Sequence, residues 1–327
     1  MRLGLGHSSR PTARFRALLT GGRPLVLPGC YNALSARVLE NAGFPAIYMT
    51  GYGTSLSLLG LPDAGLVTLT EMTLNARLIA SAVRVPLIAD ADTGFGNAIN
   101  VVRAVEEYQR AGVAGIHIED QVSPKRCGHV AGREVIDLDE AIRKIRAASD
   151  TRAALDPDFV IIARTDARGA HGGTLDAAID RANAFLEAGA DLAFVEGPAN
   201  VAEVERICRE VRGPIFYNMT GISPRFTEAE LAELGVSVVI LPGTTLRATV
   251  AALHDVAQQL KEHGIAAQKA LDVQFNAHPA GNLHDFAGFG RIRDLEEAYL
   301  PPEAMEKYSD ALGHQPGVAG PKRGTGA

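Results

Sequence analysis

Short runs of apolar and β-branched residues recur along the chain and predict buried strands. Each run is too short for a core helix and too continuously apolar for a surface strand, which favours burial on both faces. The pattern predicts eight such strands: PLVLPGCY (24–31), AIYMTG (46–51), PLIADAD (86–92), GIHIED (115–120), FVIIARTD (159–166), LAFVEG (192–197), PIFYNMT (214–220) and VSVVILPG (236–243).

Between these runs, apolar residues return every three or four positions, which is the pattern of an amphipathic helix. It is clearest over residues 98–111, 175–188 and 201–211. A left-handed glycine can end a helix at little cost, and Ala-Gly pairs occur at 42–43, 111–112 and 188–189, shortly before strands. Strand–helix alternation repeated eight times predicts a closed parallel (β/α)8 barrel, the TIM-barrel fold.

An open doubly wound sheet is the structural alternative. Its dinucleotide-binding version needs a G-x-G-x-x-G turn after a strand. Gly94-Phe95-Gly96 begins such a turn, but Ile99 stands where the third glycine belongs. These glycines therefore fit a flexible site loop better than a dinucleotide fingerprint.

The chain has 327 residues, whereas a barrel of this kind needs about 250. We therefore expect a catalytic barrel domain over residues 1–265 with an addition behind it. Beyond residue 265 the strand–helix rhythm fails, the segment 286–308 is amphipathic, and residues 313–327 have the composition of a disordered tail. The expected organisation is a barrel, a C-terminal helical arm over 266–312, and that tail.

Charge and cysteine content narrow the partners and the compartment. The formal net charge is −6 with acids and bases interspersed, which disfavours nucleic-acid binding and favours a small-molecule partner. Three cysteines without CxxC spacing predict neither a disulfide framework nor a zinc site. No apolar run approaches the roughly 20 residues of a membrane span. The Arg-rich opening lacks the apolar core of a secretory signal. A mitochondrial transit peptide can share its arginines and its lack of acids. We expect a cytoplasmic protein.

Polar residues gather at the ends of the predicted strands, where the active-site loops of a barrel begin. Any single carboxylate there could cap a helix or pair with an arginine, but the collective pattern is harder to explain structurally. Asp90 and Asp92 stand at i and i+2, so strand alternation directs both into the barrel mouth. The strand-end residues are Asp90, Asp92, Glu119, Asp120, Arg164, Asp166, Glu196 and Asn218.

Two inward carboxylates need a cation. Oxygen ligands without histidine or thiolate suit a hard ion, and Mg²⁺ keeps several waters and takes one or two protein ligands. The sequence therefore predicts a Mg²⁺ site, with Mn²⁺ as a substitute. His117, two residues before Glu119, is interpreted as a barrel-wall histidine satisfied by a neighbour and is left out of the metal site.

The segment SPKRCGHVAGRE (123–134) is interpreted as a mobile lid over the active site. Its glycines would let it fold over a ligand, and its three cations would meet an anionic one. A solvated basic loop is the alternative. Cys127 argues against it, because an exposed free thiol is reactive and is not expected in a loop that has no function. Cys30 and Cys208 are expected to be small core residues.

Seven motifs stand in order along the chain, from LGLPD (59–63) through KRCGH (125–129) to YNMT (217–220). This series resembles the isocitrate lyase and phosphoenolpyruvate mutase superfamily over about residues 24–263. KRCGH is similar to the branch that cleaves carbon–carbon bonds, including 2-methylisocitrate lyases and 2,3-dimethylmalate or 2-alkylmalate lyases; the phosphonate mutases and oxaloacetate decarboxylases lack this cysteine. ARTDARGAHG with FVEGPAN looks closer to the alkylmalate group. The motifs are LGLPD (59–63), ADADTGFGN (89–97), HIEDQ (117–121), KRCGH (125–129), ARTDA (163–167), FVEGP (194–198) and YNMT (217–220).

The resemblance implies roles for individual residues. Asp90 would hold Mg²⁺ directly, and three further acids would hold its waters: Asp63, Asp92 and Glu119. The keto-acid half of the substrate would lie on the backbone of Thr50 and Gly51. Tyr48 would take the hydroxyl proton, and Arg164 would pair with a substrate carboxylate. The far carboxylate would meet Gly128, His129, Glu196, Asn218 and Arg247.

The implied reaction is a retro-aldol or Claisen-type cleavage of a 2-hydroxy di- or tricarboxylate to pyruvate and a carboxylic acid. Loss of the hydroxyl proton lets the adjacent carbon–carbon bond break, and Mg²⁺ neutralises the developing oxyanion charge. Cys127 would protonate the carbanion, since a thiol with a pKa of about 8.5 is a usable acid. Lys125 and Arg126 would lower that pKa.

Other functions on the same scaffold are kept as alternatives. They are a phosphonopyruvate or phosphoenolpyruvate mutase, an oxaloacetate decarboxylase, and a non-catalytic keto-acid binding protein. Members of the superfamily are commonly homotetramers that exchange their last helices between subunits, and the resemblance implies the same assembly here.

Overall fold

A computed structural model describes residues 10–309 and 311–316. They form two units that are described separately, one up to Thr249 and one from Val250. Residues 1–9 and most of the predicted tail, 317–327, lie outside the described residues. None of the helices in the described ranges has the length and apolar character that a membrane span requires.

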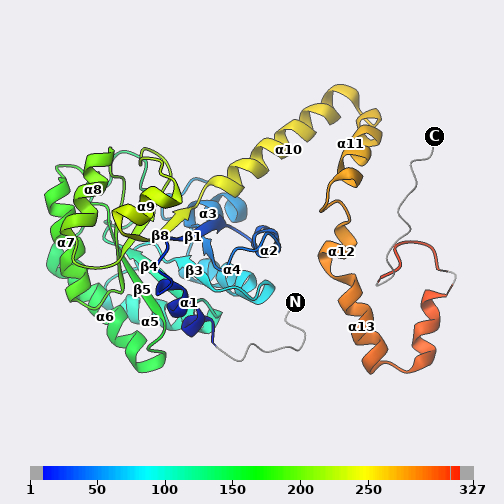
Figure 1. The fold of residues 1–327 in the computed structure, drawn as a ribbon, viewed down its shortest axis with the longest axis horizontal. Coiled ribbons are helices and arrows are strands. Elements are labelled where there is room, and N and C mark those ends of the chain that lie inside the picture. Colours follow the sequence, from blue (N-terminus) through cyan, green and yellow to red (C-terminus); the bar gives the residue numbers. More distant parts are fainter. Residues whose placement is uncertain (1–9, 310, 317–327) are drawn as a thin grey trace. The chain divides into compact units, whose positions relative to one another are not determined.

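Within residues 10–249, eight parallel strands close into a barrel in chain order (Figure 1). β1 completes the ring by pairing with β8, with Leu25 beside Val238. Each strand lies inside the run that predicted it, so the (β/α)8 fold is confirmed. The strands are β1 (Leu25–Cys30), β2 (Ile47–Met49), β3 (Leu87–Asp90), β4 (Gly115–Glu119), β5 (Val160–Thr165), β6 (Leu192–Val195), β7 (Ile215–Asn218) and β8 (Val236–Leu241).

Helices follow the strands and surround the barrel (Figure 1). The helices expected over 98–111, 175–188 and 201–211 are present as α5, α7 and α8. The glycines of the three Ala-Gly pairs adopt left-handed φ angles of 92°, 86° and 104°, as expected for helix ends. The helices are α2 (Ala33–Asn41), α3 (Gly51–Leu59), α4 (Leu69–Ala82), α5 (Ala98–Ala111), α6 (Leu138–Leu155), α7 (Leu175–Glu187), α8 (Val201–Glu210), α9 (Glu228–Leu234) and α10 (Thr244–His263), which begins in this unit.

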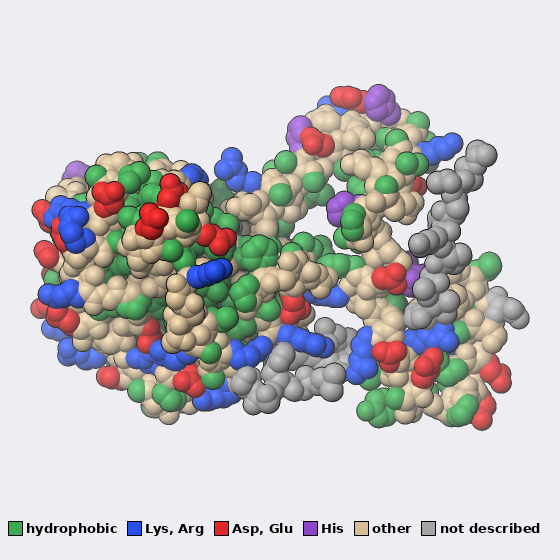
Figure 2. All heavy atoms as spheres, viewed as in Figure 1, with side chains coloured by type: hydrophobic (Ala, Val, Ile, Leu, Met, Phe, Trp, Pro, Cys, Tyr) green, Lys and Arg blue, Asp and Glu red, His purple; other side chains and the backbone are tan. Residues whose placement is uncertain are grey.

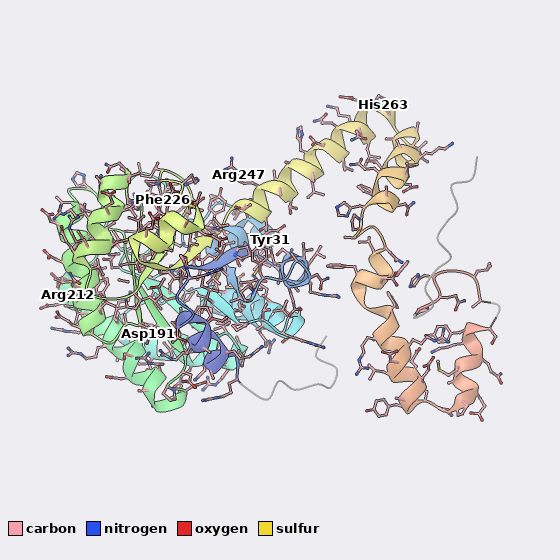
Figure 3. All side chains as sticks on the ribbon, viewed as in Figure 1. Tyr31, Asp191, Arg212, Phe226, Arg247 and His263 are labelled. Atoms are coloured by element: carbon pink, nitrogen blue, oxygen red, sulfur yellow. The ribbon has the colours of Figure 1, made fainter. Side chains whose placement is uncertain are left out.

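Apolar side chains fill the inside of the barrel. Leu27, Phe194 and Ile240 come from different strands and are almost inaccessible to solvent. α1 (Pro11–Leu19) adds Phe15 to the same cluster. Asp191, labelled in Figure 3, lies directly before β6 and pairs with Arg16 of α1 at 3.0 Å. α1 therefore packs against the end at which the strands begin, and the opposite end is left for a site.

The surface of the barrel unit carries both signs of charge. Figure 2 shows acidic and basic side chains interspersed over the visible face of this unit, without a large area of one sign.

The described part of the second unit is helical. It contains the rest of α10, then α11 (Ala266–Ala277), α12 (Leu283–Ala287), α13 (Phe289–Tyr299) and a 3₁₀ helix (Pro302–Tyr308). Glu296 accepts hydrogen bonds from Lys307 Nζ and the Tyr308 hydroxyl, and the Arg293 guanidinium lies 4.6 Å from the centre of the Tyr308 ring. These contacts join α13 to the 3₁₀ helix. The segment predicted as an arm is thus helical, and the domain boundary at residue 265 stays a prediction.

Candidate active site

A cavity of about 400 Å³ lies at the C-terminal ends of the strands, where barrels of this kind build their active sites. Arg247, labelled in Figure 3, reaches it from the first turns of α10. Gly51, Asp92 and Glu119 do not line the cavity and instead contact residues that do. The predicted residues that line it are Tyr48, Thr50, Asp63, Asp90, Cys127, Gly128, His129, Arg164, Glu196, Asn218 and Arg247.

An acidic cluster on one side of the cavity is held together by one ammonium group. Lys125 Nζ lies 2.7 Å from Asp63 Oδ1 and 2.7 Å from Asp92 Oδ1. The Asp92 backbone N–H donates to Asp90 Oδ1 at 2.9 Å. Burial opposes the charge on Lys125, but Asp92, Glu119 and the other carboxylates raise its pKa well above the usual range. The lysine is therefore charged and neutralises part of the cluster.

Asp92 reaches this cluster by a route that strand alternation did not predict. β3 ends at Asp90, and Asp92 has a φ of 46°, in the left-handed region. Asp90 lines the cavity, whereas Asp92 does not and instead contacts Lys125. The turn, and not strand alternation, therefore sets the direction of Asp92. Such a conformation is costly for a residue other than glycine and is frequent at functional sites.

The donor set fits a hard cation such as Mg²⁺, because every group in it offers oxygen. Burial raises the pKa of Asp92 to about 6 and that of Glu119 well above its usual range, so added positive charge would be stabilising. Glu119 Oε1 is also buried without a hydrogen-bond partner. Among the described residues no three acidic, histidine or cysteine side chains already surround one point; here Lys125 supplies the positive charge.

Arg164 is held by carboxylates from three strand ends. Its Nε and Nη2 donate to Oδ2 and Oδ1 of Asp166 at 2.9 and 3.0 Å. Nε also lies 3.3 Å from Glu119 Oε2, and Nη1 lies 3.2 Å from Glu196 Oε2. Burial opposes the charge on Arg164, but these three acids raise its pKa further. The cavity wall therefore carries a fixed guanidinium, which can pair with a carboxylate.

A second polar group in the wall combines Glu196, Asn218 and His129. Asn218 Nδ2 donates to Glu196 Oε2 at 3.0 Å and lies 3.3 Å from His129 Nε2. Burial lowers the pKa of His129; Glu196 opposes this and Arg164 adds to it. His129 is therefore neutral at neutral pH and can donate or accept a hydrogen bond.

Tyr48 and Gly51 both lie against Asp90. The Gly51 N–H donates to Asp90 Oδ2 at 3.1 Å, and the Tyr48 hydroxyl is 3.4 Å from the same oxygen. A Cβ atom on Gly51 would collide with this carboxylate, so position 51 requires glycine. His117 is fully buried, and its Nε2 hydrogen bonds with the Tyr48 hydroxyl. The expected neighbour is thus present at one ring nitrogen, whereas Nδ1 is buried without a partner.

Residues 123–134, called the lid segment below, carry Cys127. A bridge between Gln121 and Val135 flanks the segment at its base. From this base the Gln121 side chain donates to the Arg126 carbonyl at 2.8 Å. The Cys127 N–H donates to the Asp63 carbonyl at 3.1 Å. Cys127 is thus tied to the acidic side of the cavity.

The thiol of Cys127 is protonated at neutral pH. Burial raises its pKa, a hydrogen bond from the His129 backbone lowers it, Asp63 raises it, and Arg164 and Lys125 lower it. Lys125 lowers this pKa as expected, but burial has the larger effect and the net shift is upward. The Arg126 side chain is exposed. Of the other cysteines, Cys30 is fully buried as expected, whereas Cys208 is half-buried at the edge of a core cluster.

Several residues of the cavity were missed in the sequence. Lys125 lay within the KRCGH motif, yet no local pattern shows that its ammonium pairs with Asp63 and Asp92. Ile240, Pro242 and Leu246 form an apolar part of the wall where β8 leads into α10. Tyr52, Thr220, Gly221 and Gly243 complete the lining.

Curated relatives share most of the chain's length. The chain is 44% identical over 289 residues to 2,3-dimethylmalate lyase of Eubacterium barkeri, covering 88% of this chain and 97% of that protein. It is 39% identical over 306 residues to 2-methylisocitrate lyase of Aeropyrum pernix, covering 92% and 96%. Both relatives carry the name of a lyase.

Solved structures of similar fold also match most of the chain. A crystal structure of 2,3-dimethylmalate lyase matches with a TM-score of 0.83 and 34% identity, covering 94% of this chain and 100% of that one. A phosphonopyruvate hydrolase in complex with oxalate and Mg²⁺ matches with a TM-score of 0.80 and 33% identity, covering 90% and 100%. A structural relative therefore binds Mg²⁺ together with a small dicarboxylate.

The family model described as phosphoenolpyruvate phosphomutase matches residues 15–261, which contain the whole barrel and every residue of the cavity. The length of this match and the identity to the lyases agree with the motifs at the strand ends. The chain belongs to the phosphoenolpyruvate phosphomutase family, within the isocitrate lyase and phosphoenolpyruvate mutase superfamily.

Proposed function

We propose that this chain is a Mg²⁺-dependent carbon–carbon lyase that cleaves a 2-hydroxy di- or tricarboxylate to pyruvate and a carboxylic acid. The observation that carries the proposal is the protonated thiol of Cys127 in the wall of a cavity that also contains Arg164 and the acidic cluster. The lyase names of the relatives support it.

The side chains of the cavity can divide the reaction between them. Arg164 binds a substrate carboxylate. Tyr48 accepts the proton of the 2-hydroxyl while passing its own proton to His117 Nε2, which lies 2.7 Å away, and the hydroxyl oxygen becomes a carbonyl. The electrons of the breaking carbon–carbon bond pass to the carbon beside the second carboxylate, and Cys127 gives that carbon its proton. Solvent later restores the thiol proton. The far carboxylate would meet Gly128, His129, Glu196, Asn218 and Arg247.

Mg²⁺, with Mn²⁺ as a substitute, would be held directly by Asp90. Asp63, Asp92 and Glu119 would hold its waters. When bound, the ion supplies positive charge that stabilises the developing oxyanion. The keto-acid half would lie beside Thr50 and Gly51.

The apolar wall favours a substrate with an alkyl group. Ile240, Pro242 and Leu246 offer no partner to a polar substituent, whereas a methyl group gains roughly 1–3 kcal/mol in such a pocket. A 2-alkylmalate, 2,3-dimethylmalate or 2-methylisocitrate therefore fits better than isocitrate.

A substrate panel tests this function. The purified chain with Mg²⁺ is given these acids and isocitrate, and release of pyruvate or glyoxylate is measured. We expect pyruvate from an alkylated acid at the highest kcat/KM. A clear preference for isocitrate with glyoxylate release would reverse the substrate assignment. Turnover of phosphonopyruvate or oxaloacetate alone would favour the mutase or decarboxylase, and binding without turnover would favour a binding protein.

We also propose a cytoplasmic homotetramer. The three free cysteines suit a reducing compartment. The second unit exposes many large apolar side chains, which is typical of a surface that another chain covers, and we expect a mass of four times 34.5 kDa by light scattering. The exposed residues are Val250, Leu253, Leu260, Ile265, Val273, Phe275, Leu283, Phe289, Tyr299, Leu300 and Leu312.

A further inference from the structure

Arg133 lies at the end of the lid segment and is buried, with 6% of its surface exposed. Its Nη1 donates to Asp166 Oδ1 at 2.9 Å, and its carbonyl accepts from the His171 N–H at 3.0 Å. A Cβ atom on Gly169 would collide with Arg133 Nη2, so the chain leaves room for this guanidinium. Buried arginines are rare unless paired. This end of the lid segment is therefore fixed to the loop after β5.

Asp166 is shared between two guanidinium groups. Its Oδ1 accepts from Arg133 Nη1 and also from Arg164 Nη2, while its Oδ2 accepts from Arg164 Nε. The Asp166 N–H donates to Asp120 Oδ1 at 2.9 Å, which fixes the backbone. One buried carboxylate thus sets both the direction of Arg164 and the place where the lid segment ends.

The lid segment meets Arg164 at a second point. A Cβ atom on Gly128 would collide with Arg164 Nη2 and approach Glu196 Cγ to 2.7 Å. The backbone next to Cys127 therefore rests on the guanidinium that Asp166 holds. Cys127 is thus held in two ways. The next residue, Gly128, contacts Arg164, and the Cys127 N–H donates a hydrogen bond to the Asp63 carbonyl.

We propose that Asp166 and Arg133 are positioning residues that tie the lid segment to Arg164, so that Cys127 and the carboxylate-binding guanidinium are placed together. This inference rests on the proposed function for Cys127 and Arg164. Without Arg133 the Asp166 carboxylate keeps its two bonds to Arg164, so substrate binding persists, but the lid segment loses its anchor and Cys127 its position. The alternative is an ion pair that only stabilises the fold.

Three variants separate these cases. Arg133→Gln removes the charge, Arg133→Lys keeps it, and Arg146→Gln is the matched control, an exposed arginine of α6 outside the site. For Arg133→Gln we expect kcat to fall roughly 10- to 100-fold, the cost of a small misplacement of a reacting group, with KM changed less than about threefold. Arg133→Lys should recover part of this loss, and the control should match the parent. Unchanged kcat, or a rise in KM alone, overturns the proposal.

A second measurement does not need turnover. In a Cys208→Ala background, where Cys30 is fully buried, the rate of alkylation by N-ethylmaleimide reports the exposure of Cys127. We expect Arg133→Gln to raise this rate about tenfold in the presence of Mg²⁺ and oxalate, and Arg146→Gln to leave it unchanged. A lower melting temperature with an unchanged alkylation rate would show an ion pair that only stabilises the fold and overturns the proposal. If no acid of the panel is cleaved, the proposed function fails, and the alkylation rates still decide whether Arg133 anchors the segment.

Discussion

The hydroxyl of Tyr48 lies 2.7 Å from Nε2 of His117, inside the barrel. The two rings stack with centroids 5.7 Å apart. Burial raises the pKa of Tyr48 well above its usual range, and Asp90 raises it further. Tyr48 is therefore a neutral phenol at neutral pH. It can accept a proton from substrate only while passing its own to a neighbour, and His117 Nε2 is in reach.

Tyr48→Phe should remove this step. We expect kcat to fall by roughly 10²–10⁴, the usual contribution of a positioned acid or base. The change also leaves His117 Nε2 without its tyrosine partner, which costs about 1–3 kcal/mol of unfolding free energy. Steady-state kinetics and urea unfolding measure the two effects. Full activity in a folded Tyr48→Phe protein would remove Tyr48 from the mechanism.

Removal of divalent cations should abolish turnover, and Mg²⁺ should restore it, because the buried acids repel one another without added positive charge. Asp90→Ala should give a loss that excess Mg²⁺ does not repair. The exposed Asp150→Ala on α6 is the control. Melting temperature with and without Mg²⁺ reports binding independently of activity. Undiminished turnover in excess chelator contradicts the metal site.

Cys127→Ser should retain substrate binding and lose the proton donor. A serine hydroxyl is similar in size but a far weaker acid, so kcat should fall by roughly 10²–10⁴ while KM changes little. The half-buried Cys208→Ser is the control. A change in KM with kcat unchanged would indicate that Cys127 only packs in the segment, and it would favour the mutase alternatives.

The depressed pKa of His129 makes a contribution to stability that depends on pH. Burial holds this pKa below its ordinary 6.5, so between the two values the unfolded chain binds more protons than the folded one. Unfolding free energy therefore falls as pH drops from about 6.5 toward the lower folded pKa. The unfolding free energy, measured by urea titration, should fall less between pH 7.5 and pH 5.5 in His129→Gln than in the parent. An identical pH dependence in both proteins would show that His129 does not titrate in this way.

The barrel was predictable because each strand is a separate apolar run. β5, for example, is buried on both faces and ends in Arg164 and Thr165, so the position of its functional residue follows from where the apolar run stops. The same reasoning placed Glu196 and Asn218 directly. Parallel strands bring such ends together whatever the intervening loops contain.

Contacts between distant segments were not predictable in this way. Asp92 contacts Lys125 after a left-handed turn that follows β3, and no periodicity encodes this turn. Lys125 is far from Asp63 in the chain, and its pairing depends on how the lid segment folds back. The balance that raises the pKa of Cys127 likewise depends on burial, which the sequence does not give quantitatively.

The missing Cβ of Gly128 fixes the register in which the lid segment packs on the cavity wall. If the segment shifted by one residue in either direction, the Cβ of Cys127 or of His129 would have to occupy the place next to Arg164 where a Cβ collides. Only one register is therefore compatible with this contact, and it places the thiol one residue away from Arg164. A deletion of one residue on either side of KRCGH would have to be absorbed elsewhere in the segment for this contact to persist.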